Sequence, residues 1–313
     1  MRAHSPLREF AEYVLVRSLT GTIFALPHSS AVLVGRLLGG LAFFGLSRLR
    51  QIGERNLSIA FPDMSLSARR RLLRGCFDSL GRQLGEFCHL RKATADSLSR
   101  IVEYDPQSRI RFEEAKAKGR GILFVTAHLG GWEILAFSQS AFGNSLSFLV
   151  RPIENPRIER YVDATRTRLG NTTIRKKHAG LTCMRILKNG GTLGILADLN
   201  ALPQEGVFVP FFGRLACTTL AVTALAIPTG AVIFPVFAPW NPARRRYVVR
   251  GGPEVEIVQT GDPEQDICIN TARVTSVIER YVRAYPDQWM WIHERWHALL
   301  RPGDRVCTDF PPV

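Results

Sequence analysis

The beginning of the chain is a long apolar region. Residues 12–50 are mostly hydrophobic, and Arg17, Pro27, His28 and Arg36 break the run. A clean transmembrane span needs about twenty uninterrupted apolar residues. The pattern therefore predicts a pair of hydrophobic helices, in residues 1–50, that lie on or in a membrane leaflet. A buried helical hairpin of a soluble domain is the alternative.

The pattern becomes helical and amphipathic from residue 51 to about residue 92. Ser65 is suited to cap a helix here. The apolar positions that follow are mostly three or four residues apart, as one face of a helix requires. They are Leu66, Leu72, Leu73, Phe77, Leu80, Leu84 and Phe87.

Short apolar runs alternate with helical stretches in the rest of the chain. The runs that we predict to be strands are 121–127, 146–150, 191–198 and 231–238. The stretches that we predict to be helices lie near 108–118, 155–169, 181–188 and 218–228. This alternation predicts an α/β fold, a mixed sheet flanked by helices, in a domain that covers residues 51–313.

Charge and cysteine content restrict the cellular setting. The 41 lysines and arginines exceed the 27 acidic residues and give a net charge of +14. Such a balance fits an anionic membrane surface, an acidic substrate or carrier, or nucleic acid. Helix-turn-helix, RNA-binding and zinc-finger motifs are absent, so we expect no nucleic-acid partner. The six cysteines are scattered without a C-x-x-C pair, which favours reduced thiols facing the cytoplasm.

A histidine follows directly on one predicted strand. His128 comes after the run 121–127, where a strand turns into a helix, and catalytic groups of α/β sheets commonly occupy such turns. Glu133 lies on the first turns of the next helix, so we expect it to accept a hydrogen bond from His128. The other imidazole nitrogen then acts as a general base. A histidine that only caps the helix is the alternative.

A protein nucleophile is not evident beside this histidine. The chain has no G-x-S-x-G motif, and a substrate that brings its own hydroxyl needs none. His128 would then deprotonate that hydroxyl as it attacks an acyl thioester, in one tetrahedral step without an acyl-enzyme.

The C-terminal region contains a second histidine motif. His293, Glu294 and His297 have the H-E-x-x-H spacing, which on a helix is the signature of a zinc protease. A zinc protease also needs a third ligand, but only 16 residues follow His297. We therefore expect no metal, no cofactor and a structural role for this stretch, in which its tryptophans pack a C-terminal helix or meet the lipid interface.

The chain resembles the late acyltransferases of lipid A biosynthesis, the lauroyl and myristoyl transferases of Gram-negative inner membranes. The motifs that carry the resemblance span nearly the whole chain, and their order makes them specific. They are "ERNLSIAFPDMS" (54–65), "TAHLGGWEI" (126–134), "RPIENP" (151–156), "GILADLN" (194–200), "GVFVPFFGR" (206–214) and "QWMWIHERWH" (288–297).

The resemblance implies both a fold and a reaction. The fold is an α/β core of the glycerolipid acyltransferase type with an N-terminal membrane anchor. The reaction moves a fatty acyl chain from acyl carrier protein or coenzyme A to a hydroxyl of a lipid A precursor, at the cytoplasmic face of the inner membrane. The family's H-x4-D/E pair falls on His128 and Glu133.

Further site residues follow strand ends. Asp198 closes the run 191–198 and matches an acid that the family keeps beside its histidine; its capping a turn is the alternative. Leu199 stands where family members usually have glutamine, and Asn200 is the nearest amide. Arg151 ends another strand run, where its guanidinium suits a phosphate or carboxylate, although a plain surface role is possible. Arg214 is a weaker candidate for substrate binding.

The apolar stretch 207–213 and the proposed reaction can each be interpreted in more than one way. The stretch suits the wall of an acyl-chain tunnel, and a core strand explains it nearly as well. A transferase acting on another glycolipid, such as a phosphatidylinositol mannoside, or on a lysolipid would have the same general chemistry. A non-catalytic lipid-binding protein would keep the tunnel and the anchor without needing His128.

Overall fold

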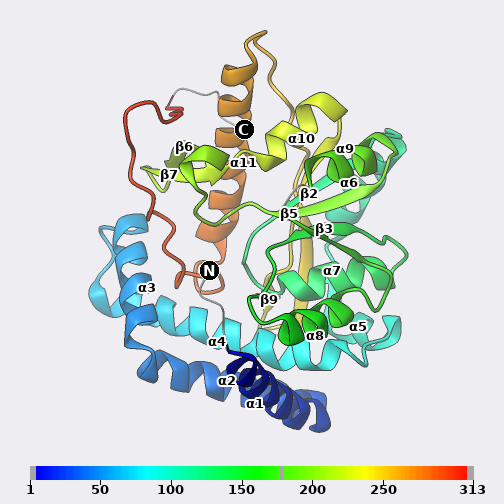
Figure 1. Ribbon diagram of the computed structural model, residues 1–313, viewed down its shortest axis with the longest axis vertical. Coiled ribbons are helices and arrows are strands. Elements are labelled where there is room, and N and C mark those ends of the chain that lie inside the picture. Colours follow the sequence, from blue (N-terminus) through cyan, green and yellow to red (C-terminus); the bar gives the residue numbers. More distant parts are fainter. Residues whose placement is uncertain (1–4, 177–178, 309–313) are drawn as a thin grey trace.

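The computed structural model describes residues 5–176 and 179–308 and places an α/β body on a layer of N-terminal helices (Figure 1). The helices are α1 (Pro6–Ala25), α2 (His28–Gly45), α3 (Ser47–Ala60), α4 (Leu66–Leu90), α5 (Ala95–Ile101), α6 (Pro106–Ala117), α7 (Trp132–Ala141), α8 (Pro156–Arg166), α9 (Gly180–Lys188), the short 3-10 helix η1 (Pro203–Glu205), α10 (Ala221–Thr229) and α11 (Pro263–Ala284).

The central sheet is mixed, as predicted. Its strand order is β1-β10-β8-β2-β5-β3-β4, and β9 pairs with β10. Strands β8, β2, β5, β3 and β4 are parallel to one another, whereas β10 runs antiparallel to β8. A separate hairpin pairs β6 with β7. The strands are β1 (Val102–Tyr104), β2 (Ile122–Thr126), β3 (Ser147–Val150), β4 (Thr172–Arg175), β5 (Thr192–Leu196), β6 (Gly206–Phe211), β7 (Arg214–Thr219), β8 (Val232–Phe237), β9 (Trp240–Asn241) and β10 (Arg246–Gly251).

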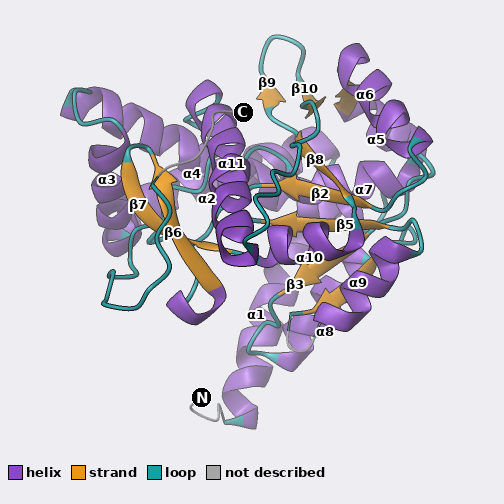
Figure 2. Ribbon diagram, turned by 90° about the horizontal axis from the view of Figure 1, so that it is seen from above, coloured by secondary structure: helices purple, strands orange, loops and turns teal. Residues whose placement is uncertain are grey.

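Helices cover both faces of this sheet (Figure 2). Strand β2 is buried throughout, because its alternate side chains enter two different cores. Leu123 and Val125 pack toward α9, α10 and α11, whereas Ile122 and Phe124 pack toward α6 and α7. Burial on both faces explains why the strand is a continuous apolar run in the sequence.

The N-terminal helices pack closely on the body through glycines. Gly35 and Gly39 of α2 face Gly81 and Gly85 of α4, and a Cβ added at Gly35 would lie 2.2 Å from the carbonyl oxygen of Gly81. Spacing small residues four apart lets two helix backbones approach one another. The 1–50 region therefore shares a tight helix–helix interface with the remainder of the chain.

The opposite face of α2 is apolar and exposed. Leu33, Leu37, Leu41 and Phe44 are 54–67% exposed on this helix. Among the described residues, α2 is the one helix that is long and apolar enough to cross a membrane. An exposed apolar patch of this kind marks a membrane or partner surface.

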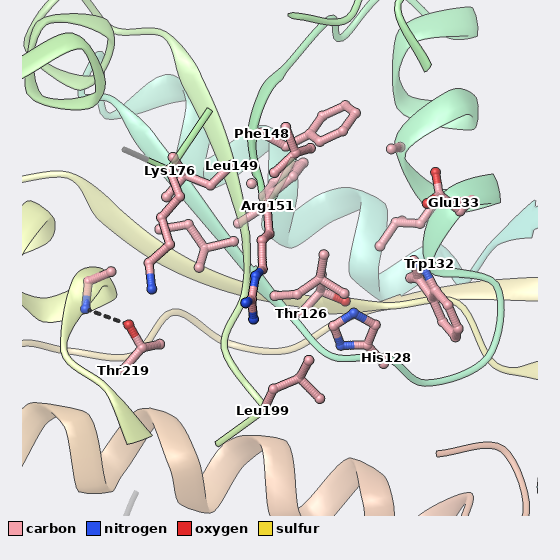
Figure 3. Close-up of a pocket in the computed structure, with 18 of the residues that line it drawn as sticks. Thr126, His128, Trp132, Glu133, Phe148, Leu149, Arg151, Lys176, Leu199 and Thr219 are labelled. Atoms are coloured by element: carbon pink, nitrogen blue, oxygen red, sulfur yellow. Dashed lines mark hydrogen bonds between the residues drawn. The ribbon is translucent and has the colours of Figure 1, made fainter. Parts of the chain in front are cut away.

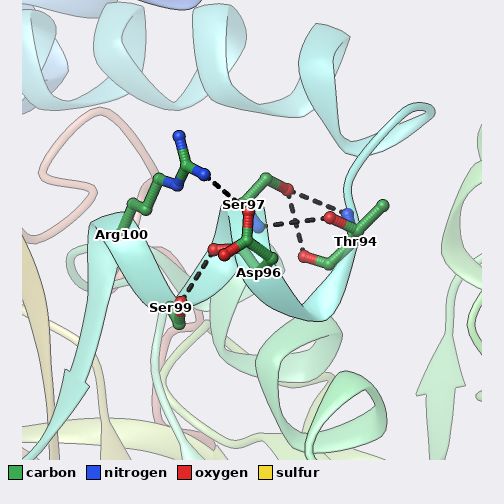
Figure 4. Close-up of polar contacts among 5 residues, drawn as sticks. All are labelled: Thr94, Asp96, Ser97, Ser99 and Arg100. Carbon is green, nitrogen blue, oxygen red and sulfur yellow. Dashed lines mark hydrogen bonds and ion pairs between the residues drawn. The ribbon is translucent and has the colours of Figure 1, made fainter.

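A capping box begins the short helix α5 that leads to the edge strand β1 (Figure 4). The backbone N–H of Ser97 donates to Thr94 Oγ1 at 3.2 Å, and the backbone N–H of Thr94 donates to Ser97 Oγ at 2.8 Å. Arg100 pairs with Asp96 one turn apart at 2.7 Å. These bonds satisfy the first N–H groups of the helix and define its start after α4.

Two regions differ from the expectation. The sequence analysis did not identify α11 or β10, although α11 supplies Val274, Val277 and Ile278 to the main core. The H-E-x-x-H stretch is not helical, because residues 285–308 contain no helix, and the neighbouring Trp289 and Trp291 are buried in the main core together with residues of α11. Backbone hydrogen bonds to other segments hold this part of the chain instead.

Candidate active site

The ends of the parallel strands β2 and β5 bring His128 and Asp198 together. Thr126 and Leu196 are paired in the register of the two strands, and the N–H of Ala197 donates to the Thr126 carbonyl at 3.1 Å. Each chain then leaves the sheet at the same edge, two residues further on. His128 and Asp198 are therefore neighbours although they are 70 residues apart in sequence.

Asp198 holds the histidine at two points. His128 Nδ1 lies 2.9 Å from Asp198 Oδ1, and the backbone N–H of His128 donates to Oδ2 at 2.8 Å. The indole N–H of Trp289 donates to the same Oδ2 at 2.8 Å. With a carboxylate against Nδ1, the proton belongs on that nitrogen, and Nε2 is left as the acceptor.

Asp198 is ionised in this setting despite being only 1% exposed. Burial by itself raises the pKa of a carboxyl group. The electrostatic interaction with His128 and the hydrogen bonds from His128 and Trp289 act in the opposite direction, and together they lower the pKa of Asp198 below its ordinary value. The buried carboxylate therefore keeps its charge next to the imidazole.

Glu133 has a different partner from the one expected. Arg166 of α8 donates from Nε to both Glu133 carboxylate oxygens, at 3.2 and 3.1 Å, and its Nη2 also contacts Oε1. The carboxylate of Glu133 points away from the His128 ring in Figure 3. The expected hydrogen bond between His128 and Glu133 is wrong, because the carboxylate of Asp198 occupies the imidazole Nδ1. Burial lowers the pKa of Arg166, but the charge and hydrogen bonds of Glu133, together with the charges of Glu159 and Asp163, outweigh burial and raise this pKa above its ordinary value.

A cavity of about 410 Å³ opens beside His128 (Figure 3). Side chains from β2, β3, β5 and α7 form its apolar wall, which includes Phe124, Leu135, Leu146, Phe148, Leu149 and Ile195. Polar groups gather in the same lining: Thr126, His128, Glu133, Arg151, Arg166, Lys176, Asn200, Thr219 and His293. An apolar hollow with a few convergent polar groups is the usual form of a small-ligand or lipid site.

Two of the three predicted substrate-binding residues line the cavity, and the third does not. Arg151 and Asn200 line the cavity, and so does Leu199. Arg214 does not line it and is exposed at the start of β7. The apolar residues of β6 are core residues rather than a tunnel wall, since Val207 and Val209 pack against Ile269 and Ala272 of α11.

The segment 288–298, which we call the C-terminal strap, supports the site from outside the sheet. The N–H of Gly130 donates to the Gln288 carbonyl at 3.1 Å, and the N–H of Met290 donates to the His128 carbonyl at 3.0 Å. Asn56 Nδ2 of α3 donates to the carbonyls of Trp291 and His293, at 2.7 and 2.6 Å. The strap thus joins α3 to the backbone on either side of the histidine.

His293 is a cavity residue that the sequence analysis did not assign to the site. Its Nε2 accepts a hydrogen bond from the backbone N–H of Asn200 at 3.2 Å, so its own proton belongs on Nδ1. Burial lowers the pKa of His293 and favours the neutral ring. The only sequence signal for this role is the dense block of aromatic residues around it.

The H-E-x-x-H spacing does not produce a metal site geometry. A zincin helix places both histidines on one face, whereas here His293 lines the cavity and His297 is exposed, 3.3 Å from Glu294. No group of three potential ligands that could hold a metal occurs in the ranges 5–176 and 179–308. The cysteines at six positions are all free thiols.

Comparisons with known proteins converge on one family. The family model described as bacterial lipid A biosynthesis acyltransferase matches residues 3–298. The lipid A biosynthesis lauroyltransferase of Escherichia coli is 28% identical over 279 residues, which covers 88% of this chain and 87% of the relative. The palmitoleoyltransferase of the same organism is 24% identical, covering 87% and 86%, and its myristoyltransferase is 21% identical, covering 76% and 72%.

Proposed function

This chain belongs to the bacterial lipid A biosynthesis acyltransferase family, and from that premise we propose that His128 catalyses direct transfer of a fatty acyl group from a thioester to a hydroxyl of a lipid A precursor. The observation that carries the proposal is the pair of His128 and Asp198 at an apolar cavity. The apolar wall suits the acyl chain, and the imidazole suits the proton of the attacking hydroxyl.

The reaction needs no protein nucleophile. The acceptor hydroxyl attacks the thioester carbonyl, and its proton passes to His128 Nε2. Asp198 balances the charge of the imidazolium that forms, through the Nδ1 hydrogen bond. The attack forms the new oxygen–carbon bond of the tetrahedral intermediate. Collapse of this intermediate re-forms the carbonyl and breaks the carbon–sulfur bond, and the leaving thiolate takes the proton from His128.

Glu133 and Arg166 act together in this proposal. Their paired hydrogen bonds place one guanidinium in the cavity lining. Arg151 and Lys176 add two further cations to the same lining, although Lys176 is paired with Glu205 at 2.5 Å. Phosphate and carboxylate groups of the acceptor, and the phosphate of the donor's carrier, are suitable partners for these cations. We assign Asn200 to substrate binding on the same wall, and leave Arg214 outside the site.

The donor in this proposal is acyl carrier protein or coenzyme A, and the site faces the cytoplasm. The net charge of +14 favours an acidic carrier and an anionic leaflet. The exposed apolar face of α2 would lie in the membrane. Replacing both Leu37 and Leu41 by glutamate should reduce recovery of the protein with lipid vesicles in a flotation assay, because the apolar face of α2 would then carry two charges. Both side chains are exposed, so the packing of α2 on α4 should remain intact.

Transfer by the purified protein tests the function. Acyl carrier protein and coenzyme A thioesters are each incubated with a lipid A precursor, and mass spectrometry measures the gain of one acyl group. We expect transfer from one of the two donors, and we expect His128→Ala to lower that transfer by about 100-fold to 10,000-fold. A folded wild-type protein that binds the lipids without transferring an acyl group would support the non-catalytic alternative, and transfer only to another glycolipid or a lysolipid would replace the acceptor.

A further inference from the structure

A second hollow, of about 290 Å³, lies at the edge of the sheet where α6, the end of β10 and the C-terminal half of α11 meet. We call it the arginine cleft. Its lining consists of Asp105, Ser108, Arg111, Arg250, Gly251, Arg280, Tyr281, Ala284 and Tyr285. None of these residues lines the cavity beside His128. The cleft is therefore a separate feature of the molecule and does not depend on the proposed reaction.

Three different elements each contribute one guanidinium to this cleft. Arg111 comes from α6, Arg250 from β10 and Arg280 from α11. Asp105 is the single carboxylate of the lining, and its Oδ2 already accepts hydrogen bonds from the backbone N–H and the hydroxyl of Ser108. The three guanidinium groups outnumber the carboxylates among the described residues of the lining.

Two of the guanidinium groups lack an acidic partner. Within the part of the chain that the structure describes, neither Arg111 nor Arg250 has a carboxylate oxygen within 4.0 Å. Arg111 Nη1 donates to the Gly251 carbonyl at 3.2 Å, whereas Arg250 Nε is removed from solvent and has no hydrogen-bond partner. A buried charged donor without an acceptor is costly, so it calls for an anion or water in the cleft.

We propose that the arginine cleft binds a phosphate group. A guanidinium presents a planar set of N–H donors that matches phosphate oxygens, and several of them around one hollow satisfy a multiply charged group. Tyr281 and Tyr285, whose hydroxyls are neutral donors, belong to the same lining. The phosphate comes either from a free phosphate compound or from the headgroup of a membrane lipid, since both offer the same oxygens.

The test uses the purified full chain and two probes. Isothermal titration measures binding of inorganic phosphate, and flotation compares phosphatidylcholine vesicles with and without phosphatidic acid. Arg250→Gln and, separately, Arg111→Gln remove one guanidinium each. Arg109→Gln is the matched control, because Arg109 is exposed on the same helix α6 and does not line the cleft.

We expect the cleft variants to weaken phosphate binding by about 10-fold to 100-fold, the usual effect of losing hydrogen bonds to a charged group. Binding in the Arg109→Gln control should equal that of the wild type. If the cleft variants bind inorganic phosphate more weakly than the wild type in the titration, the ligand is a free phosphate compound. If phosphatidic acid increases the flotation of the wild type but not of the cleft variants, the ligand is a lipid headgroup.

Two results would overturn the proposal. One is the absence of wild-type binding in both arms, and the other is binding by both cleft variants that matches the wild type. Melting curves and wild-type acyl transfer show that a variant is folded. If Arg250→Gln does not fold, Arg111→Gln decides the outcome, because its side chain is only partly buried.

Discussion

The turn after β2 and the C-terminal strap each contain a histidine and a glutamate that are close in sequence, but the two pairs are arranged differently in space. In the turn, His128 is fixed by Asp198, a residue 70 positions away, while Glu133 binds Arg166. In the strap, Glu294 contacts His297 at the surface, and His293 faces the cavity. The surrounding structure, rather than the spacing within a motif, therefore decides what each histidine does.

The largest expected difference between the two regions is in turnover. His128→Ala should lower acyl transfer by about 100-fold to 10,000-fold, the usual contribution of a positioned base. Substrate binding should change little. His297→Ala is the control from the strap and should transfer at the wild-type rate, because this side chain is 70% exposed. Steady-state kinetics of both variants make the comparison, and similar rates for the two would refute it.

Glu133→Gln should lower turnover by a smaller factor, about 10-fold to 100-fold, corresponding to roughly 1.4 to 2.8 kcal/mol. The change leaves Arg166 in the cavity wall without its carboxylate, so its position is no longer fixed. Glu103→Gln, which removes the surface ion pair with Arg244, is the matched control. If Glu133→Gln had no effect on transfer while the protein stayed folded, the ion pair would have no part in the reaction.

Asn56→Ala tests what holds the strap. The variant loses two hydrogen bonds to the carbonyls of Trp291 and His293. Leaving buried carbonyls without donors should cost about 1 to 3 kcal/mol of unfolding free energy. Chemical denaturation measures the change, with Ser58→Ala, an exposed position on the same helix, as the control. An unchanged midpoint would mean that these two hydrogen bonds do not stabilise the strap.

His293→Ala should have the smallest effect of the series. It removes the acceptor of the Asn200 N–H at the cavity wall, and one such neutral hydrogen bond is worth about 1 kcal/mol, or roughly fivefold in rate. The loss should appear in acyl transfer with little change in the melting curve. If the variant had a lower melting temperature but an unchanged rate of acyl transfer, the role of His293 would be purely structural.

Local patterns were enough to predict the scaffold around the site. The strands β2, β5 and β8 are short apolar runs that are largely buried on both faces, and β3 is a short apolar run that is partly buried. The position of His128 at a strand end follows from these runs. Asp198 could be expected at the same edge, since parallel strands that are neighbours end together.

The remainder depends on contacts between distant segments. Arg166 lies 33 residues from Glu133, and nothing near it marks it as a partner. The strap has no regular structure, so its role comes from hydrogen bonds to α3 and to the turn after β2, which periodicity does not encode. Helix α11 was missed although Asp262 caps it with two backbone hydrogen bonds, because polar residues dilute its apolar stripe.

A double-mutant cycle on turnover tests whether Asp198 acts by orienting His128. We measure acyl transfer by the wild type, His128→Ala, Asp198→Asn and the double variant, each verified as folded by its melting curve. If Asp198 acts through the histidine, Asp198→Asn should be severely slowed, and the double variant should transfer about as fast as His128→Ala alone. Independent losses that multiply in the double variant, or an Asp198→Asn protein with wild-type turnover, would contradict the account.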